Sequence, residues 1–292
     1  MGREPFGVSE HAVSSLLSAC TSAGDLAAGE RVAALWLQTG ASSEYVTAAI
    51  IDLYGKCGAV EQAQSVFDSI VNPDAASYTA MISADVRVGD LETGLSLLER
   101  MAHEPFSVSA HAVSSLLPAC ATAGDLAAGE RVAALWRESG ASSEFVTAAL
   151  IDMYGKCGLL AEAHRVFDSS AHRDAVTYAA MINAYGQNGQ APTALKLFDE
   201  MEREGIAVSE PAVVCVLSAC SHWGLADEAM ALYHRLPALG IQCSNTFAAC
   251  VVDALARCGR LDEAEEFAEA AGCSTDRVVR VSLLGLLAPT AT

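Results

Sequence analysis

Apolar residues recur along the chain with the spacing of one face of an α-helix. The spacing i, i+3, i+4, i+7, or a close variant, is found at Ala63, Val66, Phe67 and Ile70, at Ala194, Leu197, Phe198 and Met201, and at Val146, Leu150, Met153 and Tyr154. Alternation with a period of two never extends beyond a few positions, so an all-α fold is predicted. Each helix has only about 12 residues, which is too short to be stable alone in water. We therefore expect the helices to pack as stacked hairpins.

The sequence also repeats itself. Residues 5–58 align with residues 105–158 at an offset of 100, and 43 of the 54 aligned positions are identical. A third, diverged copy follows at the same offset. Turn glycines occur about every 30 to 35 residues, a period typical of solenoids, at Gly24, Gly58, Gly89 and Gly124. Because glycine suits the left-handed residue that ends many helices, each of these glycines predicts a turn between two helices.

Charge is the property of the composition that most changes this picture. Apolar residues make up 52% of the chain, enough for a continuous core, and no apolar run reaches the roughly 18 residues of a membrane span. The net charge is −19, which opposes nucleic-acid binding because phosphate contacts supply most of the nonspecific affinity. The N-terminus has neither a signal core nor an Arg/Ser-rich transit peptide, and it begins inside a repeat.

The ten cysteines include no CxxC pair, so the usual spacing of a zinc site is missing. Six of them recur at two equivalent positions, in the sets Cys20, Cys120 and Cys220, and Cys57, Cys157 and Cys258. We interpret these six as small buried hydrophobic residues and expect a reducing compartment. Trp36 and Trp136 are also duplicates and are predicted to lie in the core.

Several segments resemble the pentatricopeptide repeat family. Residues 175–189, followed by 194–201, resemble its standard repeat; residues 149–158 with 163–168 resemble the short variant, and 113–120 with 124–129 the long variant. The alternation resembles the plant-type subclass with mixed repeat lengths. The resemblance implies a right-handed α-solenoid, a superhelix of stacked helix-turn-helix repeats.

The resemblance also assigns a register to the whole chain. Eight units are predicted at residues 10–43, 44–74, 75–109, 110–143, 144–174, 175–209, 210–244 and 245–276, after a truncated unit at 1–9 and before a partial unit at 277–292. The first long, short and standard units have 34, 31 and 35 residues, which together give the observed offset of 100.

In this family one repeat addresses one base of single-stranded RNA, and the fifth and last residues of a unit read the base edge. Those positions hold Ser14 with Ser43, Ala48 with Asp74, Thr79 with Ser109, Ser114 with Ser143, Ala148 with Asp174, and Ala179 with Ser209. Alanine has no hydrogen-bonding side chain, so only Ser14, Thr79 and Ser114 keep a reader at the fifth position. Asp74 and Asp174 are equally explained as N-caps of the following helices.

Two further roles follow from the resemblance. The residue near position thirteen would lie by the phosphate backbone, and it is basic at Lys56, Arg87, Lys156 and Arg257. The alternative for these cations is the favourable end of a helix dipole. The second residue would wedge between bases, and Tyr45, Phe145 and Val176 suit that role. For the two aromatic residues, packing in the core is the alternative.

No HExxH, GxSxG, GxGxxG or Walker-type motif occurs, and HxE with CxxC is missing, so we expect neither an enzyme, a metal nor a cofactor. The resemblance implies a single-stranded RNA-binding adaptor of a mitochondrion or plastid, acting in RNA processing, stabilisation or editing. Its partners would be RNA and RNA-processing or editing proteins, with no membrane. The alternative is a helical scaffold for protein–protein interaction, which the acidic charge favours.

Overall fold

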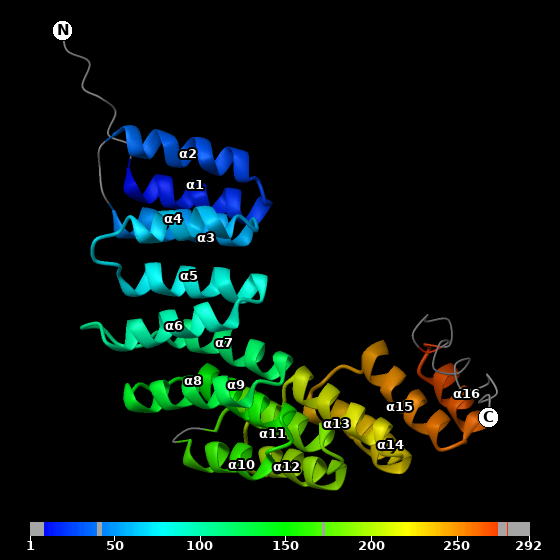
Figure 1. Ribbon diagram of the computed structural model, residues 1–292. Helices are drawn as coiled ribbons and strands as arrows, with labels where there is room; N and C mark the ends of the chain where they lie inside the picture. Colours follow the sequence, from blue (N-terminus) through cyan, green and yellow to red (C-terminus); the bar gives the residue numbers. More distant parts are fainter. Residues whose placement is uncertain (1–8, 40–42, 171–172, 274–278, 280–292) are drawn as a thin grey trace, which may run out of the picture. The chain divides into compact units, whose positions relative to one another are not determined.

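The computed structural model describes residues 9–39, 43–170, 173–273 and Val279. Within these residues all regular secondary structure is helical and no strand occurs, which confirms the predicted all-α class. The truncated unit 1–9, apart from Ser9, and the partial unit 277–292, apart from Val279, lie outside the described residues. The chain divides into two compact units, Met1–Val146 and Thr147–Thr292, and each is a stack of hairpins (Figure 1).

The first unit contains four hairpins. They are α1 (Glu10–Ala23) with α2 (Leu26–Gln38), α3 (Glu44–Lys56) with α4 (Val60–Asp68), α5 (Ala75–Val88) with α6 (Leu91–Ala102), and α7 (Ala110–Ala123) with α8 (Leu126–Glu138). The first helices of successive hairpins pack on one another, and each second helix packs on the first helix of its own hairpin. Helix α9 (Glu144–Lys156) spans the division between the two units.

The second unit continues the same pattern. After α9 come α10 (Leu160–Ser169), the hairpin of α11 (Ala175–Gln187) with α12 (Ala191–Arg203), that of α13 (Glu210–His222) with α14 (Ala226–Arg235), a 3-10 turn at Leu236–Leu239, and the hairpin of α15 (Asn245–Arg257) with α16 (Leu261–Ala270). Within the described residues, no helix is both long and apolar enough to cross a membrane. Every first helix begins at a predicted unit start, although the division into whole repeats stays a prediction.

The first helices approach one another closely where glycine meets alanine. A Cβ atom added to Gly55 on α3 would lie 2.6 Å from the Cβ of Ala84 on α5, so only glycine permits this helix separation. The corresponding pairs in the second unit are Gly155 with Ala184 and Gly186 with Ala219. At the hairpin turns, Gly24 and Gly124 end α1 and α7 in the left-handed conformation, as the sequence predicts.

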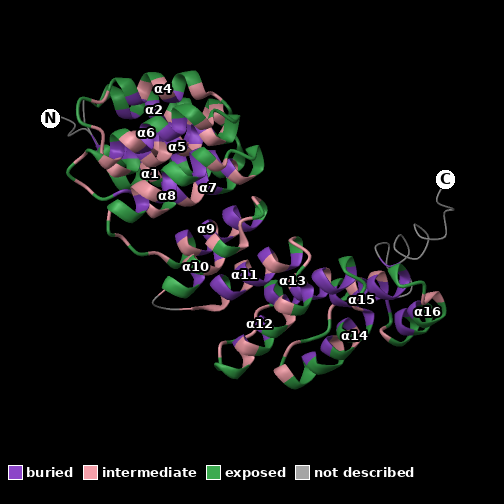
Figure 2. Cartoon of the chain, turned by 60° about the horizontal axis from the view of Figure 1, so that its bottom comes forward, coloured by how far each residue is buried: buried purple, intermediate pink, exposed green. Residues whose placement is uncertain are grey.

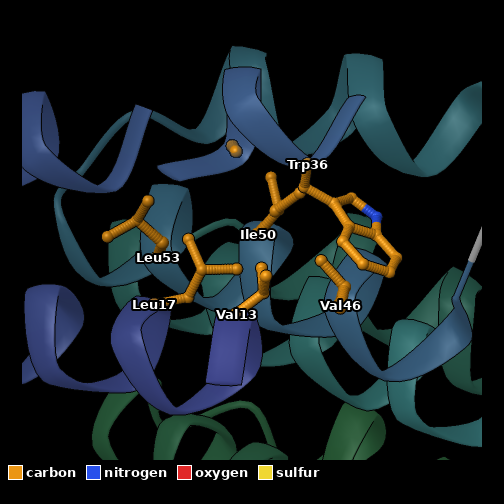
Figure 3. Close-up of a cluster of buried hydrophobic side chains, with 7 residues drawn as sticks. Val13, Leu17, Trp36, Val46, Ile50 and Leu53 are labelled. Atoms are coloured by element: carbon orange, nitrogen blue, oxygen red, sulfur yellow. The ribbon is translucent and has the colours of Figure 1, made fainter. Parts of the chain in front are cut away.

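Apolar side chains fill the space between the two helix layers of each unit, so the buried positions lie where helices meet (Figure 2). In the first unit, side chains from α1, α2 and α3 form one such cluster around Val13, Leu17, Trp36, Val46, Ile50 and Leu53 (Figure 3). The predicted burial of Trp36 and Trp136 is confirmed. None of these helices buries its apolar face without its neighbours.

The interpretation of the recurring cysteines is only partly right. Cys120 and Cys220 are buried, whereas Cys20, Cys57 and Cys157 are half-buried and Cys258 is exposed. Cys57 and Cys258 directly follow α3 and α15, at the C-caps of these helices. These positions lie at the surface because they follow the last helical turn, which the apolar period alone does not reveal.

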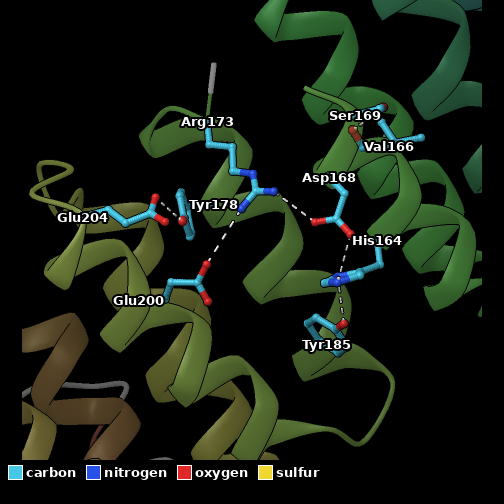
Figure 4. Close-up of polar contacts among 9 residues, drawn as sticks. All are labelled: His164, Val166, Asp168, Ser169, Arg173, Tyr178, Tyr185, Glu200 and Glu204. Atoms are coloured by element: carbon cyan, nitrogen blue, oxygen red, sulfur yellow. Dashed lines mark hydrogen bonds and ion pairs between the residues drawn. The ribbon is translucent and has the colours of Figure 1, made fainter. Parts of the chain in front are cut away.

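Polar contacts tie α10, α11 and α12 together in the second unit (Figure 4). The guanidinium of Arg173 lies 3.1 Å from Asp168 and 3.8 Å from Glu200, and it covers the ring of Phe167. The Tyr178 hydroxyl donates a 2.7 Å hydrogen bond to Glu204. Burial, reinforced by that bond, raises the pKa of Tyr178 to about 12. Through its contacts with Asp168, Glu200 and Phe167, Arg173 holds α10 and α12 together.

Asp85 on α5 breaks the rule that buried polar groups are paired. It is only 2% exposed, and its Oδ2 atom has no hydrogen-bond partner among the described residues. One repeat offset later, Tyr185 stands in its place and bonds to His164. Burial, together with the nearby charge of Asp90, raises the pKa of Asp85 to about 7. The folded protein therefore binds a proton here that the unfolded chain releases near pH 4.

Replacing Asp85 with asparagine should remove the loss of folding stability that the buried carboxyl group causes as the pH rises. Because the raised pKa makes wild-type stability fall as the pH rises from about 4 to about 7, the advantage of Asp85→Asn should grow by about 2 kcal/mol between pH 5 and 7 and then level off. Urea unfolding of the full chain from pH 5 to 8.5, followed by circular dichroism, measures this advantage. Asp262→Asn, at an exposed site on α16, is the matched control. Parallel curves for Asp85→Asn and wild type would contradict the prediction.

Candidate nucleic-acid interface

One line of side chains runs along the outer face of every first helix. On α3 it consists of Tyr45, Ala48, Asp52 and Lys56, the second, fifth, ninth and thirteenth residues of the helix. The spacing of three and four residues places them on one face. We call the residues at these four positions the front stripe of each first helix. In the first unit the front stripes of α3 and α5 line one hollow of about 550 Å³, with Lys56, Thr79 and Ser83 among its walls.

The candidate wedge residues are exposed. Tyr45 and Phe145 each have 72% of their surface exposed, so the alternative of core packing is wrong for both. Val176, on α11, is also exposed. The helical period explains why the two aromatic rings are exposed, because the next residues along the helices, Val46 and Val146, are the ones that face the core. An exposed aromatic ring at the start of a helix can stack on a base.

The candidate readers at the fifth position carry little free hydrogen-bonding capacity. The hydroxyl groups of Ser14, Thr79 and Ser114 donate to backbone carbonyls of their own helices, those of His11, Ala75 and His111. Their oxygen atoms keep acceptor capacity. The other fifth residues, Ala48, Ala148 and Ala179, have only a methyl group as side chain; Ala148 is buried, and Ala48 and Ala179 are half-buried.

The candidate readers at the last position of each unit are helix N-caps. Asp174 Oδ1 accepts a 2.8 Å hydrogen bond from the Thr177 amide and a 2.6 Å bond from the Thr177 hydroxyl. Ser43, Asp74, Ser109 and Ser209 accept from the third residue of the helix that follows each of them, and Ser143 directly precedes α9. The N-cap alternative for Asp74 and Asp174 is confirmed, and Ser43 and Ser109 have the same role.

The candidate phosphate-binding cations lie in the last turns of first helices, and three of them are already paired. Lys56 Nζ lies 2.8 Å from Asp52, Lys156 Nζ 2.7 Å from Asp152, and Arg257 Nε 2.9 Å from Asp253. Arg87 on α5 has no acidic partner within the described part of the chain, since the ninth residue there is Ser83. All four cations are exposed.

The pairing of the thirteenth residue with the ninth extends beyond the cations. The other four contacts are Ser22 with the Ser18 carbonyl, Thr122 with the Pro118 carbonyl, Gln187 with Asn183, and His222 with the Ser218 carbonyl. Sequence reasoning identified the cations and missed their aspartate partners. The signal was present, since an acid four residues before a base on a helix predicts an ion pair.

The chemistry of the face is therefore that of a binding surface. It offers exposed aromatic rings at the helix starts, small residues in the middle, and cations near the helix ends. Among the described residues no group of three or more His, Cys, Asp or Glu side chains could hold a metal ion.

Comparisons with known proteins give a consistent result. The model of the PPR repeat matches residues 48–72, 76–105, 148–170, 213–241 and 250–268, and the model of the PPR repeat family matches 173–222. Together these matches span more than half of the chain. A pentatricopeptide repeat-containing protein of Arabidopsis thaliana is 35% identical over 228 residues, which cover 76% of this chain and 35% of that protein. Another from the same plant, named chloroplastic, is 36% identical over 210 residues, 71% of this chain and 34% of that protein.

Solved structures show the same fold. The crystal structure of the pentatricopeptide repeat protein PPR10 in complex with an 18-nt psaJ RNA element matches with a TM-score of 0.75 and 21% sequence identity, over 97% of this chain and 44% of that chain. The crystal structure of the pentatricopeptide repeat protein PPR10 from maize matches with a TM-score of 0.55, also at 21% identity, over 93% of this chain and 46% of that chain. The chain spans about a third of the length of the curated relatives it matches.

Substitutions at Asp174 test its role as the N-cap of α11. Asp174→Ala should lower the free energy of unfolding by about 1 kcal/mol, because the first turn of α11 loses its cap. Asp174→Asn retains an acceptor oxygen and should stay within a few tenths of a kcal/mol of wild type. Urea denaturation of the full chain measures both values. Equal losses in the two variants would show that the carboxylate charge, rather than the cap, stabilises the protein at this position.

Proposed function

This chain belongs to the pentatricopeptide repeat family, and from that premise we propose that it binds single-stranded RNA along its front stripes. The part of the protein spanned by this chain is a repeat scaffold and not an enzyme. It acts as an adaptor that holds an RNA strand, with one repeat for each base. The division into eight units is part of this proposal.

One observation carries the proposal. Exposed aromatic residues lie at the second position of α3 and α9, and exposed cations lie at the thirteenth position of α3, α5, α9 and α15. A flexible strand needs flat groups for its bases and positive groups for its phosphates. The first unit supplies both on α3, where Tyr45 and Lys56 lie on the same stripe. Support also comes from the fold, which matches that of PPR10 in complex with RNA.

The finer features of the proposal come from the family. The predicted alternation of long, short and standard units supports membership of the plant-type subclass with mixed repeat lengths. The protein would work in a mitochondrion or plastid, in RNA processing, stabilisation or editing, alongside proteins of those reactions. One relative is named chloroplastic, which supports an organellar location.

A protein-binding scaffold is the second candidate, and the ion pairs favour it. Asp52, Asp152 and Asp253 place negative charge within hydrogen-bond distance of three of the four cations. The net charge of −19 acts in the same direction. A front face with neutralised cations suits a basic protein better than a polyanion.

Binding to a random pool of single-stranded RNA at about 0.15 M salt, followed by enrichment sequencing, tests the proposed function. Enrichment of a motif of up to about eight nucleotides, one for each predicted unit, would support an adaptor that reads sequence. Retention without enrichment would support an adaptor that holds RNA of any sequence. No retention would overturn the RNA proposal for this chain and leave the scaffold as the better candidate.

The salt dependence of that binding assigns the phosphate contacts. Four contacts on a single strand predict a log–log slope of about −3, and Lys56→Ala with Lys156→Ala should flatten it by about 1 to 2. Lys196→Ala, an exposed lysine on the second helix α12, should leave the slope unchanged. Asp52→Asn with Asp152→Asn frees the same two lysines and should raise the affinity. If the lysine variants match wild type, phosphate binding does not use these residues.

A further inference from the structure

A cavity recurs at the same place in both units. In the first unit it lies between α5 and α7, has a volume of about 440 Å³ and is lined by Ser115, Thr122 and Ala123 among others. In the second unit it lies between α11 and α13, has a volume of about 460 Å³ and is lined by Cys215, His222 and Trp223. These residues correspond at the repeat offset of 100, so the helix stacking itself creates the space.

The two copies differ in chemistry. The copy in the first unit is walled by small and aliphatic residues, with Ala123 where the second has Trp223. Trp223 is 51% exposed, while Trp36 and Trp136 lie in the core. A large aromatic side chain on a surface cavity has no role in packing a hydrophobic core and is available to a ligand.

The indole ring of Trp223 is held in position. Its Nε1–H group donates a 2.8 Å hydrogen bond to the carbonyl of Gly186 at the end of α11. The ring also passes over the following turn, where a Cβ atom on Gly189 would lie 2.9 Å from Cη2 of Trp223. Glycine at this position therefore makes room for the ring. A ring fixed in this way loses little conformational entropy when a flat ligand stacks on it.

Polar groups beside the ring can both donate and accept hydrogen bonds. His222 bonds through Nδ1 to the Ser218 carbonyl at 2.7 Å, and because a carbonyl only accepts, Nδ1 carries the proton. The other ring nitrogen, Nε2, is then an acceptor in the neutral imidazole. Gln187 donates to Asn183 at 3.3 Å and keeps its own amide oxygen as an acceptor and its second amide hydrogen as a donor.

The walls of this cavity also carry no charge. On α3, α9 and α15 the ninth and thirteenth residues are an acid and a base, whereas on α11 they are Asn183 and Gln187, and on α13 Ser218 and His222. The cavity therefore lies where the front stripe would otherwise place a cation for phosphate. A ligand held here must be recognised by stacking and neutral hydrogen bonds.

We propose that the Trp223 cavity binds a nucleobase, which stacks on the indole and bonds through its edge to Gln187 and His222. The inference rests on the proposed function, because the base belongs to the bound RNA strand. A nucleobase has the flat ring, the edge donors and the edge acceptors that these walls match. At the junction of α11 and α13 the strand is thus held by stacking, whereas Lys56, Arg87, Lys156 and Arg257 supply charge on α3, α5, α9 and α15.

Tryptophan emission tests this proposal, because Trp223 is exposed and the two other tryptophans are buried. Single-stranded RNA of mixed sequence should quench the emission in a saturable manner, and Trp223→Phe should abolish the quenching while it keeps a stacking ring. Free adenosine and uridine form the second arm and separate a base within a strand from a free nucleoside. Quenching by RNA with none by nucleosides assigns the site to the strand, and quenching by both shows that the base alone is recognised.

Affinity supplies an independent readout. Trp223→Ala should weaken RNA binding about tenfold, a typical effect of losing one stacked base, and should leave the salt slope unchanged because no phosphate contact is lost. The urea midpoint of Trp223→Phe and Trp223→Ala controls for folding. Unchanged affinity in Trp223→Ala, with no quenching in wild type, overturns the site while the RNA proposal stands. Saturable quenching by nucleosides without RNA retention supports the site and overturns the RNA proposal instead.

Discussion

Every helix in this chain depends on its neighbours to bury its apolar face. Helices of this length are at best marginally stable alone in water, and a single hairpin leaves exposed the apolar side chains that would pack on its neighbours. At three of the stacked pairs the closest approach is that of glycine on one first helix to alanine on the next, as between Gly55 and Ala84. A larger residue at either place would separate the helices and open the core between the layers.

This constraint decides which groups remain for a ligand. Stacking buries the inner face of each first helix. The last residues of the predicted units serve as N-caps, because they accept hydrogen bonds from the first turn of the helix that follows. The capping aspartates and serines already accept backbone hydrogen bonds, so only their remaining hydrogen-bonding capacity is available to a base. The front stripe remains on the outer face. Its first member, the second residue of the helix, is exposed on α3 and α9 because the third residue, Val46 or Val146, faces the core.

Much of this architecture follows from the sequence, for physical reasons that are local. The apolar period, the turn glycines and the caps at Asp74 and Asp174 depend on interactions within a few residues, and all were predicted. The exposure of Tyr45 and Phe145 was left open, because either ring suits a core or a surface and only the packing of Val46 and Val146 decides. The burial of Asp85 was not predicted either. Other repeats have cysteine or tyrosine at this position, as at Cys120 and Tyr185, and the helical period alone does not show that an acid there is buried. The Trp223 cavity depends on how far two helices stand apart, which no motif encodes.

The net charge of −19 weakens RNA binding less than its magnitude suggests. Fields between exposed charges decay over about 8 Å at physiological salt, and packed helix axes stand about 8 to 10 Å apart. Acids on the second helices are therefore largely screened from the front stripes. The aspartates beside Lys56 and Lys156 are not screened, but exposed pairs of this kind contribute at most about 1 kcal/mol. A phosphate group carries a full charge and offers several acceptor oxygens, so it can replace such a partner at little cost. Neither the distant acids nor the local pairs on the stripe therefore prevent this face from binding a polyanion, although the local pairs weaken the attraction more.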